Sequence, residues 1–161
     1  MLYTIKSQAV STCPENELLL CCSRTHMDSK NAERLKILVK EKIDWDYLAQ
    51  TATQQGVMPL LYWNLTQNCL QAVPDMILTQ LRASFEANAG SNLFLTSELF
   101  KILNLFEVHG IPAIPYKGAI LAALAYSNLA LRQFSDLDIL VHPRDILRAE
   151  DVLIAHGYSP G

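Results

Sequence analysis

The residues of this sequence best suited to binding or catalytic chemistry are two aspartates separated by one residue, Asp136 and Asp138. They lie in residues 134–141, a stretch typical of a β-strand that ends in a purely apolar run. Side chains two apart on a strand share one face, with α-carbons about 6.5–7 Å apart, so both carboxylates can bind one divalent cation. Acids that enter a buried strand repel each other unless a cation or hydrogen-bond donors compensate. The pattern favours a metal site; its alternative is a capped, solvated turn.

A lysine-glycine turn precedes the aspartates and has the character of a phosphate site. Gly118 lets the backbone approach a ligand closely, and a helix predicted from Ala119 would present unpaired N–H groups to an anion. Lys117 would add positive charge beside a phosphate. The alternative is an ordinary glycine turn with a solvated lysine. Arg132 either contacts a phosphate or forms an ion pair with one of the aspartates.

Helices dominate the part of the chain before this turn. Apolar periodicity, capping residues and breakers predict helices at about residues 14–24, 30–42, 45–55, 60–66 and 75–109. Asp44 is the expected cap of the third and Gly56 its end, and the fifth is expected to bend or break near Gly90. After Gly110 the pattern changes to an extended segment at 111–116, a buried helix at 119–126, the strand at 134–141 and a last helix from about residue 142 to Gly157.

These elements predict a mostly helical α+β protein with about two strands. The expected divisions are a loose leader at 1–13, a helical region at 14–110 and a partial α/β core at 111–161. With 161 residues, 50% of them hydrophobic, the chain is long enough for one domain with a real core. A net charge of −3 argues against general nucleic-acid binding without excluding a small basic pocket. The cysteines have no zinc-site spacing, and the chain shows neither a signal peptide nor a transmembrane run, so we expect a cytoplasmic protein without a membrane partner.

Taken together, the motifs resemble the uncharacterised bacterial nucleotidyltransferase family of the polymerase-beta-like superfamily. The resemblance rests on residues 116–119, Leu121, Tyr126, Arg132 and 135–141, and it extends to Asp44-Trp45, residues 56–62 and residues 156–158. It implies that Asp136 and Asp138 bind Mg²⁺ and act in catalysis. It also implies that Gly118 and Lys117 lie near the phosphates of a nucleoside triphosphate such as ATP. The Lys117–Gly118 pair departs from the superfamily's glycine-serine turn.

The same resemblance implies a third carboxylate on a neighbouring strand. After Val141 the acids are Asp145, Glu150 and Asp151, all on the predicted last helix. We therefore expect a truncated chain with weak or absent transfer of a nucleoside monophosphate to an acceptor that the sequence does not identify. The alternative is a non-catalytic helical module that binds a protein partner and keeps a vestigial nucleotide site.

Overall fold

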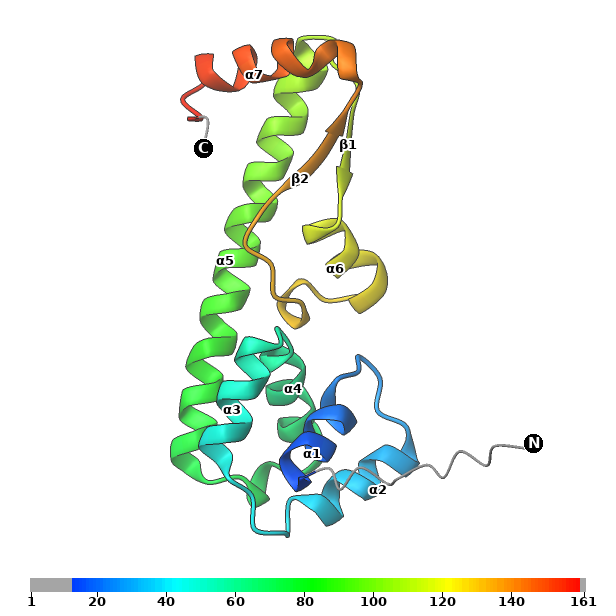
Figure 1. Ribbon diagram of the computed structural model, residues 1–161, viewed down its shortest axis with the longest axis vertical. Coiled ribbons are helices and arrows are strands. Elements are labelled where there is room, and N and C mark those ends of the chain that lie inside the picture. The colour runs from blue at the N-terminus through cyan, green and yellow to red at the C-terminus, as the bar shows by residue number, and fades with distance from the viewer. Residues whose placement is uncertain (1–12, 160–161) are drawn as a thin grey trace, which may run out of the picture.

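The structure, a computed structural model, describes residues 13–159 and is a mostly helical α+β fold, as predicted. Of the leader predicted at 1–13, residues 1–12 lie outside the described residues. Figure 1 shows an elongated molecule in which one long helix, α5 (Asp75–Val108), runs from end to end. Short helices gather around its first half, and a two-stranded sheet with two further helices packs along its second half. No helix in the described part of the chain is long and apolar enough to cross a membrane.

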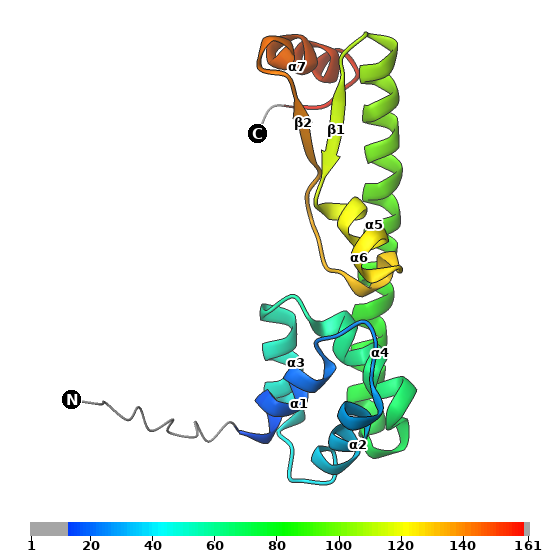
Figure 2. The same ribbon diagram turned by 90° about the vertical axis from the view of Figure 1, so that its right-hand side faces the viewer.

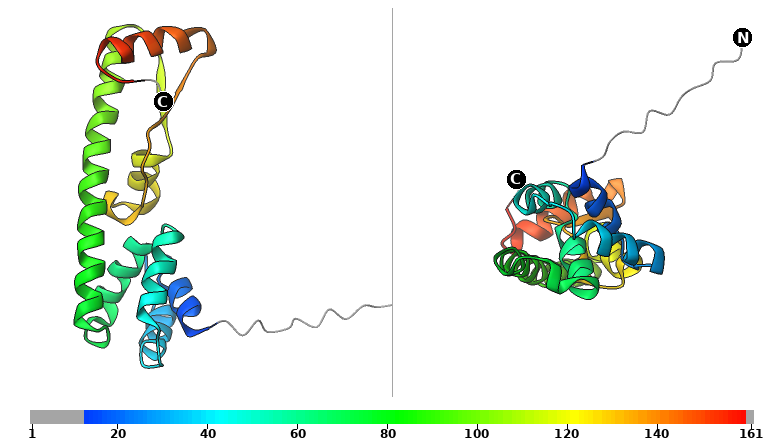
Figure 3. Two further views of the ribbon diagram at one scale, coloured as in Figure 1. Left: turned by 60° about the vertical axis from the view of Figure 1, so that its left-hand side comes forward. Right: turned by 90° about the horizontal axis from the view of Figure 1, so that it is seen from below.

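The lower helical region consists of the first half of α5 and four short helices, α1 (Pro14–Cys22), α2 (Ser29–Leu38), α3 (Trp45–Gln54) and α4 (Met58–Asn68). Its core is one cluster of buried side chains from all five helices. The fully enclosed members include Leu18, Leu35, Leu48, Leu61 and Leu65. Seen from below, these helices surround a common centre (Figure 3).

Local capping explains where these helices begin and end. The Asp44 carboxylate accepts a hydrogen bond of 3.0 Å from the Tyr47 backbone N–H, so the predicted cap of α3 is confirmed. Gly56 follows α3 with a φ of +68°, a conformation that glycine adopts without strain. Asp28 caps α2 in the same way as Asp44 caps α3.

Helix α5 is continuous through Gly90, so the break allowed there by the sequence does not occur. A glycine inside a helix costs only about 1 kcal/mol relative to alanine. The contacts on both sides offset that cost, because Leu81 packs into the lower core and Leu99 into the upper part of the molecule. Helix α5 is therefore shared by both halves, and at 34 residues it is about 50 Å long.

The upper α/β region comprises β1 (Ala113–Tyr116), α6 (Gly118–Tyr126), β2 (Asp138–Val141) and α7 (Ile146–Ala155), which are packed on the second half of α5 (Figure 2). The strands pair antiparallel, with Ala113 opposite Val141 and Tyr116 opposite Asp138. Two small cores join them to α5, one around Leu99 and one around Phe106.

Two sequence predictions for this region are wrong. The strand predicted at 134–141 pairs only from Asp138, because its partner ends at Tyr116, where the chain turns into α6. Helix α6 was predicted to be buried, yet Leu124 is 80% exposed and only Gly118, Ala119 and Ala122 are enclosed. Both differences arise from tertiary context: a strand needs a partner along its length, and α6 packs along one narrow face.

Candidate functional site

Asp138 is the first residue of β2, and Asp136 lies two residues before it. Leu137 and Ile139 both pack into the upper cores, so the residues on either side of them point outward. Asp136 is exposed in the unpaired segment, and Asp138 begins the strand with its side chain 41% exposed. The local reason is the alternation of apolar and polar residues, which gives the two carboxylates a common, solvent-facing side.

The turn at Lys117–Gly118 lies directly beside this segment. Gly118 has a φ of +37°, and a Cβ placed there would lie 3.5 Å from the Asp136 carbonyl oxygen and 3.7 Å from Cδ2 of Phe134. There is thus space for a small side chain, but the backbone conformation favours glycine. The fold brings the predicted turn and the predicted acids together, although they are separated by more than 15 residues of sequence.

Lys117 is the cation nearest to the acid pair among the described residues. Its Nζ lies 4.0 Å from Oδ2 of Asp138 and 5.2 Å from the centre of the Tyr116 ring. At this distance and with half-exposed side chains the ion pair is weak, worth less than about 1 kcal/mol. The Lys117 backbone has φ +54° and ψ −135°, an unfavourable region for a residue with a side chain that costs about 1–3 kcal/mol. The fold therefore holds this lysine beside Asp138 at some expense in stability.

The N-terminus of α6 adds a second source of positive potential. No side chain caps it, and Leu121 makes the first backbone bond of the helix, to the Lys117 carbonyl. The N–H groups of the first helical turn have no acceptor inside a helix and carry part of its positive dipole end. An anionic ligand near Gly118 would meet these groups and the Lys117 ammonium.

Arg132 supports the turn instead of pairing with an aspartate. Its Nη1 donates a hydrogen bond of 3.4 Å to the Gly118 carbonyl, and its guanidinium lies 5.6 Å from the centre of the Phe134 ring. Among residues 13–159 no ion pair joins Arg132 to Asp136 or Asp138. Of the two roles predicted for Arg132, aspartate pairing is thus not seen, and phosphate contact stays a prediction.

Two asparagines of α5 hold the loop before the aspartates, and the sequence analysis missed both. Asn92 is fully buried and donates hydrogen bonds of 2.6 and 2.7 Å to the carbonyls of Leu129 and Arg132. Asn88, one turn earlier, donates to the carbonyls of Ala130 and Arg132 at 2.9 and 3.4 Å. The sequence does contain a signal for this role: the two asparagines are four residues apart and lie on the same helix face as Leu95 and Leu99. A polar pair on an apolar stripe indicates a buried hydrogen-bonding role.

A third carboxylate does not join Asp136 and Asp138 within residues 13–159, where no cluster of three or more histidine, cysteine, aspartate or glutamate side chains could hold a metal. Asp145 is buried but accepts a hydrogen bond of 2.8 Å from Arg148, which also donates to the His109 carbonyl. That carboxylate therefore anchors the start of α7 to the end of α5. Glu150 and Asp151 lie on α7, as predicted.

The comparison with known proteins adds a family to this geometry. The family described as uncharacterised nucleotidyltransferase matches residues 41–161, three quarters of the chain. This chain belongs to that nucleotidyltransferase family. The match begins just before α3 and includes every candidate site residue. No curated protein and no solved structure gave a significant match.

Proposed function

We propose that the protein binds a nucleoside triphosphate with Mg²⁺ and that its family chemistry is transfer of the nucleoside monophosphate to an acceptor. The observation that carries this proposal is the common outward side of Asp136 and Asp138 beside the turn at Gly118. The family match supports the general nucleotidyltransferase character. Placement in the polymerase-beta-like superfamily is part of the proposal.

The two aspartates fit a magnesium ion that takes its other ligands from phosphates and water. Mg²⁺ prefers oxygen ligands and is commonly held by one or two carboxylates together with substrate phosphates. Both side chains reach solvent, and within residues 13–159 the one ion pair in which they take part is the weak contact between Asp138 and Lys117. When bound, Mg²⁺ supplies positive charge that offsets the negative charge of the reacting phosphates.

The remaining residues of the site would bind and orient the triphosphate. Gly118 leaves room for close approach, and the first N–H groups of α6 point toward an anion at that position. Lys117 would exchange its weak contact with Asp138 for a phosphate oxygen, which is the stronger partner. Arg132 holds the Gly118 carbonyl and so fixes the orientation of the turn.

We further propose that the described residues bind the nucleotide but transfer it weakly or not at all. Nucleotidyl transfer needs a base that accepts the proton of the attacking hydroxyl, and the third acid implied by the family resemblance is not found among residues 13–159. Robust transfer of AMP from ATP by this chain with Mg²⁺ would show that this part of the proposal is wrong.

The test of the binding proposal is calorimetric titration of the protein with ATP in the presence of Mg²⁺ or of EDTA. We expect Mg²⁺-dependent binding that Asp136→Asn weakens at least about tenfold, a loss of about 1.4 kcal/mol. Asp151→Asn makes the same change of charge on the exposed surface of α7 and serves as the matched control. Circular dichroism of both variants checks that the fold is intact.

Two outcomes would count against a nucleotide site. Equal ATP affinity for Asp136→Asn and the unmodified protein would remove Asp136 from the site. Absence of ATP binding with and without Mg²⁺ would favour the alternative, a non-catalytic module whose lower helical region binds a protein.

A further inference from the structure

A cavity lies where the lower helical region meets the segment before β2. It has a volume of about 580 Å³, and we call it the waist pocket. Its walls come from three places: the corner between α3 and α4, the middle of α5, and residues 133–135. Figure 3 shows the end of α3 and the loop before β2 facing each other beside α5. Helix α5 spans both regions and contributes the middle wall of the pocket.

Most of the residues that line the waist pocket have a neutral polar side chain. Hydroxyl and amide side chains are contributed by Gln54, Ser84, Asn88, Ser91, Gln133 and Ser135. The buried side chains of Met58 and Phe134 add apolar surface. None of the described residues that line it is charged. An anion or a cation would lose water there without gaining a counter-charge, which is costly. An uncharged ligand with several hydroxyl groups and an apolar ring face matches this lining.

Asn88 gives the pocket one polar group of fixed orientation. Both N–H bonds of its amide are used, because they donate to the carbonyls of Ala130 and Arg132. The side-chain oxygen is then the atom left to accept a hydrogen bond from a ligand hydroxyl. Since Asn88 also lines the pocket, a hydroxyl-bearing ligand would find a preoriented acceptor there.

The waist pocket adjoins the segment that leads to the aspartates. Ser135 lines it and directly precedes Asp136, and the α-carbons of Ser135 and Asp138 are at most about 11 Å apart. Phe134 lines the pocket as well, and its ring faces Gly118. In phosphoryl transfer the attacking and leaving oxygens lie on opposite sides of phosphorus. With a nucleotide at Gly118, the acceptor therefore needs a separate site near the aspartates, and the waist pocket adjoins the segment that carries them.

From this arrangement we infer that the waist pocket binds the acceptor, and that the acceptor is an uncharged molecule rich in hydroxyl groups, as a sugar is. Calling the ligand an acceptor rests on the proposed function, because the acceptor is the second substrate of that reaction. The binding of an uncharged, hydroxyl-rich ligand to the pocket is tested separately. In the reaction an acceptor hydroxyl oxygen would form the new bond to the α-phosphorus, pyrophosphate would leave, and the hydroxyl proton would pass to water, since no third carboxylate lies at the site among residues 13–159.

The test is a nuclear magnetic resonance titration of the full chain with three probes, without metal or nucleotide. The probes are methyl glucoside, which is neutral, glucosamine, which is cationic, and glucose 6-phosphate, which is anionic. We expect methyl glucoside to shift the backbone amide signals of Ser84, Ser91 and Gln133 more than the charged probes do. Ser91→Trp, which fills the pocket, should weaken this binding about tenfold or more.

The matched control is Ser97→Trp, an exposed serine of α5 that does not line the pocket. Gln133→Ala removes a pocket amide without adding bulk and should weaken the binding less than Ser91→Trp. Equal effects of the two tryptophans, stronger binding of a charged probe, or no shift with any probe would overturn the inference.

Addition of ATP with Mg²⁺ separates this inference from the proposed function. Simultaneous binding of methyl glucoside and ATP would support the inference. Competition between them at the same amide signals would assign the pocket to the nucleoside and overturn the inference. If methyl glucoside binds and ATP does not, the ligand class assigned to the pocket is supported and the nucleotide proposal fails.

Discussion

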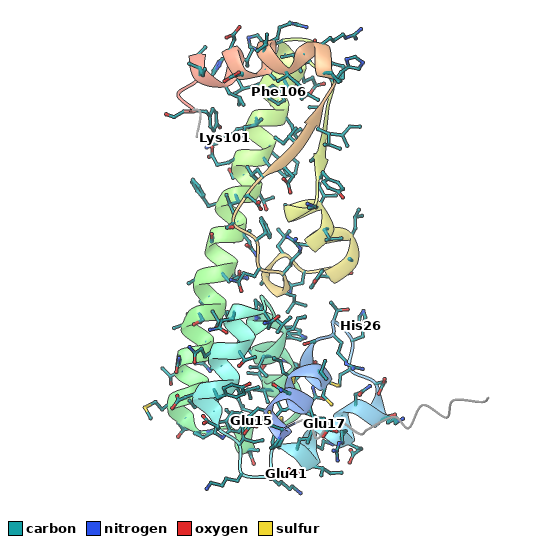
Figure 4. The ribbon with its side chains drawn as sticks, viewed as in Figure 1. Glu15, Glu17, His26, Glu41, Lys101 and Phe106 are labelled. Atoms are coloured by element: carbon teal, nitrogen blue, oxygen red, sulfur yellow. The ribbon has the colours of Figure 1, made fainter. Side chains whose placement is uncertain are left out.

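The two ends of α5 differ in how completely they enclose their apolar side chains. The lower helical region has one core in which several leucines are fully buried. The upper α/β region has two small cores and leaves Ile114, Leu124 and Leu140 more than half exposed. Figure 4 labels Glu15 at the first end and Phe106 at the second. Stability is thus concentrated in the region without the aspartates, while the region that presents them stays open to ligands.

Each region also contains a buried asparagine, and the two asparagines have different structural roles. Asn64 in α4 donates hydrogen bonds to the carbonyls of Cys22, Arg24 and Leu60 and ties together helices of the lower core. Asn92 in α5 ties down the loop that leads to the aspartates. The same side chain therefore supports packing in one region and the candidate site in the other.

The largest effect is expected from truncating a leucine of the lower core. Leu61→Ala should lower the free energy of unfolding by about 3–5 kcal/mol, because Leu61 is fully enclosed by surroundings that cannot collapse onto the cavity. Leu99→Ala in the smaller upper core should cost about 2–3 kcal/mol. Urea unfolding measures both, with the exposed Leu20→Ala as the control. A larger loss of unfolding free energy for Leu99→Ala than for Leu61→Ala would contradict the conclusion that stability is concentrated in the lower core.

Removal of the two asparagine amides should have similar effects on stability and different effects on binding. Asn64→Ala and Asn92→Ala each remove the hydrogen bonds of a buried amide to backbone carbonyls, which should cost about 1–3 kcal/mol. Only Asn92→Ala should also weaken ATP binding, because it frees the loop at residues 129–132. Titration below the unfolding temperature of each variant separates the two effects. Equal ATP affinity for the two variants would show that the loop is held without Asn92.

The smallest effect is expected from one carboxyl in each region. The backbone N–H of Asp44 donates to Glu15 and lowers the pKa of that carboxyl below its ordinary value of 4.5. In the upper region Lys101 and then Tyr158 lower the pKa of Glu98. A lowered folded-state pKa stabilises the protein above the ordinary pKa, and the gain is lost as the pH falls through the lowered value.

Glu15→Gln should therefore cost about 1 kcal/mol at neutral pH and nothing at a pH below the lowered pKa. Glu98→Gln should cost less, since its partners are on the surface. Urea unfolding at neutral and acidic pH measures both, and Glu41→Gln on the lower surface is the control. A cost for Glu15→Gln that does not change with pH would contradict the assignment.

Local rules predicted much of the lower region. Helix α3 follows from Asp44 and Gly56, and α5 begins after Pro74 as expected. The errors lie where distant residues decide. The length of β2 depends on the end of β1 at Tyr116, and the exposure of α6 depends on which face meets α5. Neither the pairing of β2 with β1 nor the packing of α6 on α5 can be predicted from local sequence patterns.

The candidate site was likewise predicted only in part. A nucleotidyltransferase family was predicted from the motifs and is confirmed over residues 41–161, whereas its bacterial character and its placement in the polymerase-beta-like superfamily stay predictions. The metal-binding roles of Asp136 and Asp138, and the phosphate roles of Lys117, Gly118 and Arg132, stay predictions, as does the cytoplasmic location. Asn88 and Asn92 were missed because they act on a loop about 40 residues later in the chain.

The unbroken α5 has a thermodynamic consequence for recognition. Residues of α5 form the middle wall of the waist pocket, so a change in wall spacing that involves this helix would require it to bend and would strain its backbone hydrogen bonds. A ligand consequently meets walls whose spacing is already set and spends little of its interaction free energy on ordering them. Discrimination among ligands by shape follows, because a stiff support does not adjust to a molecule that fits poorly.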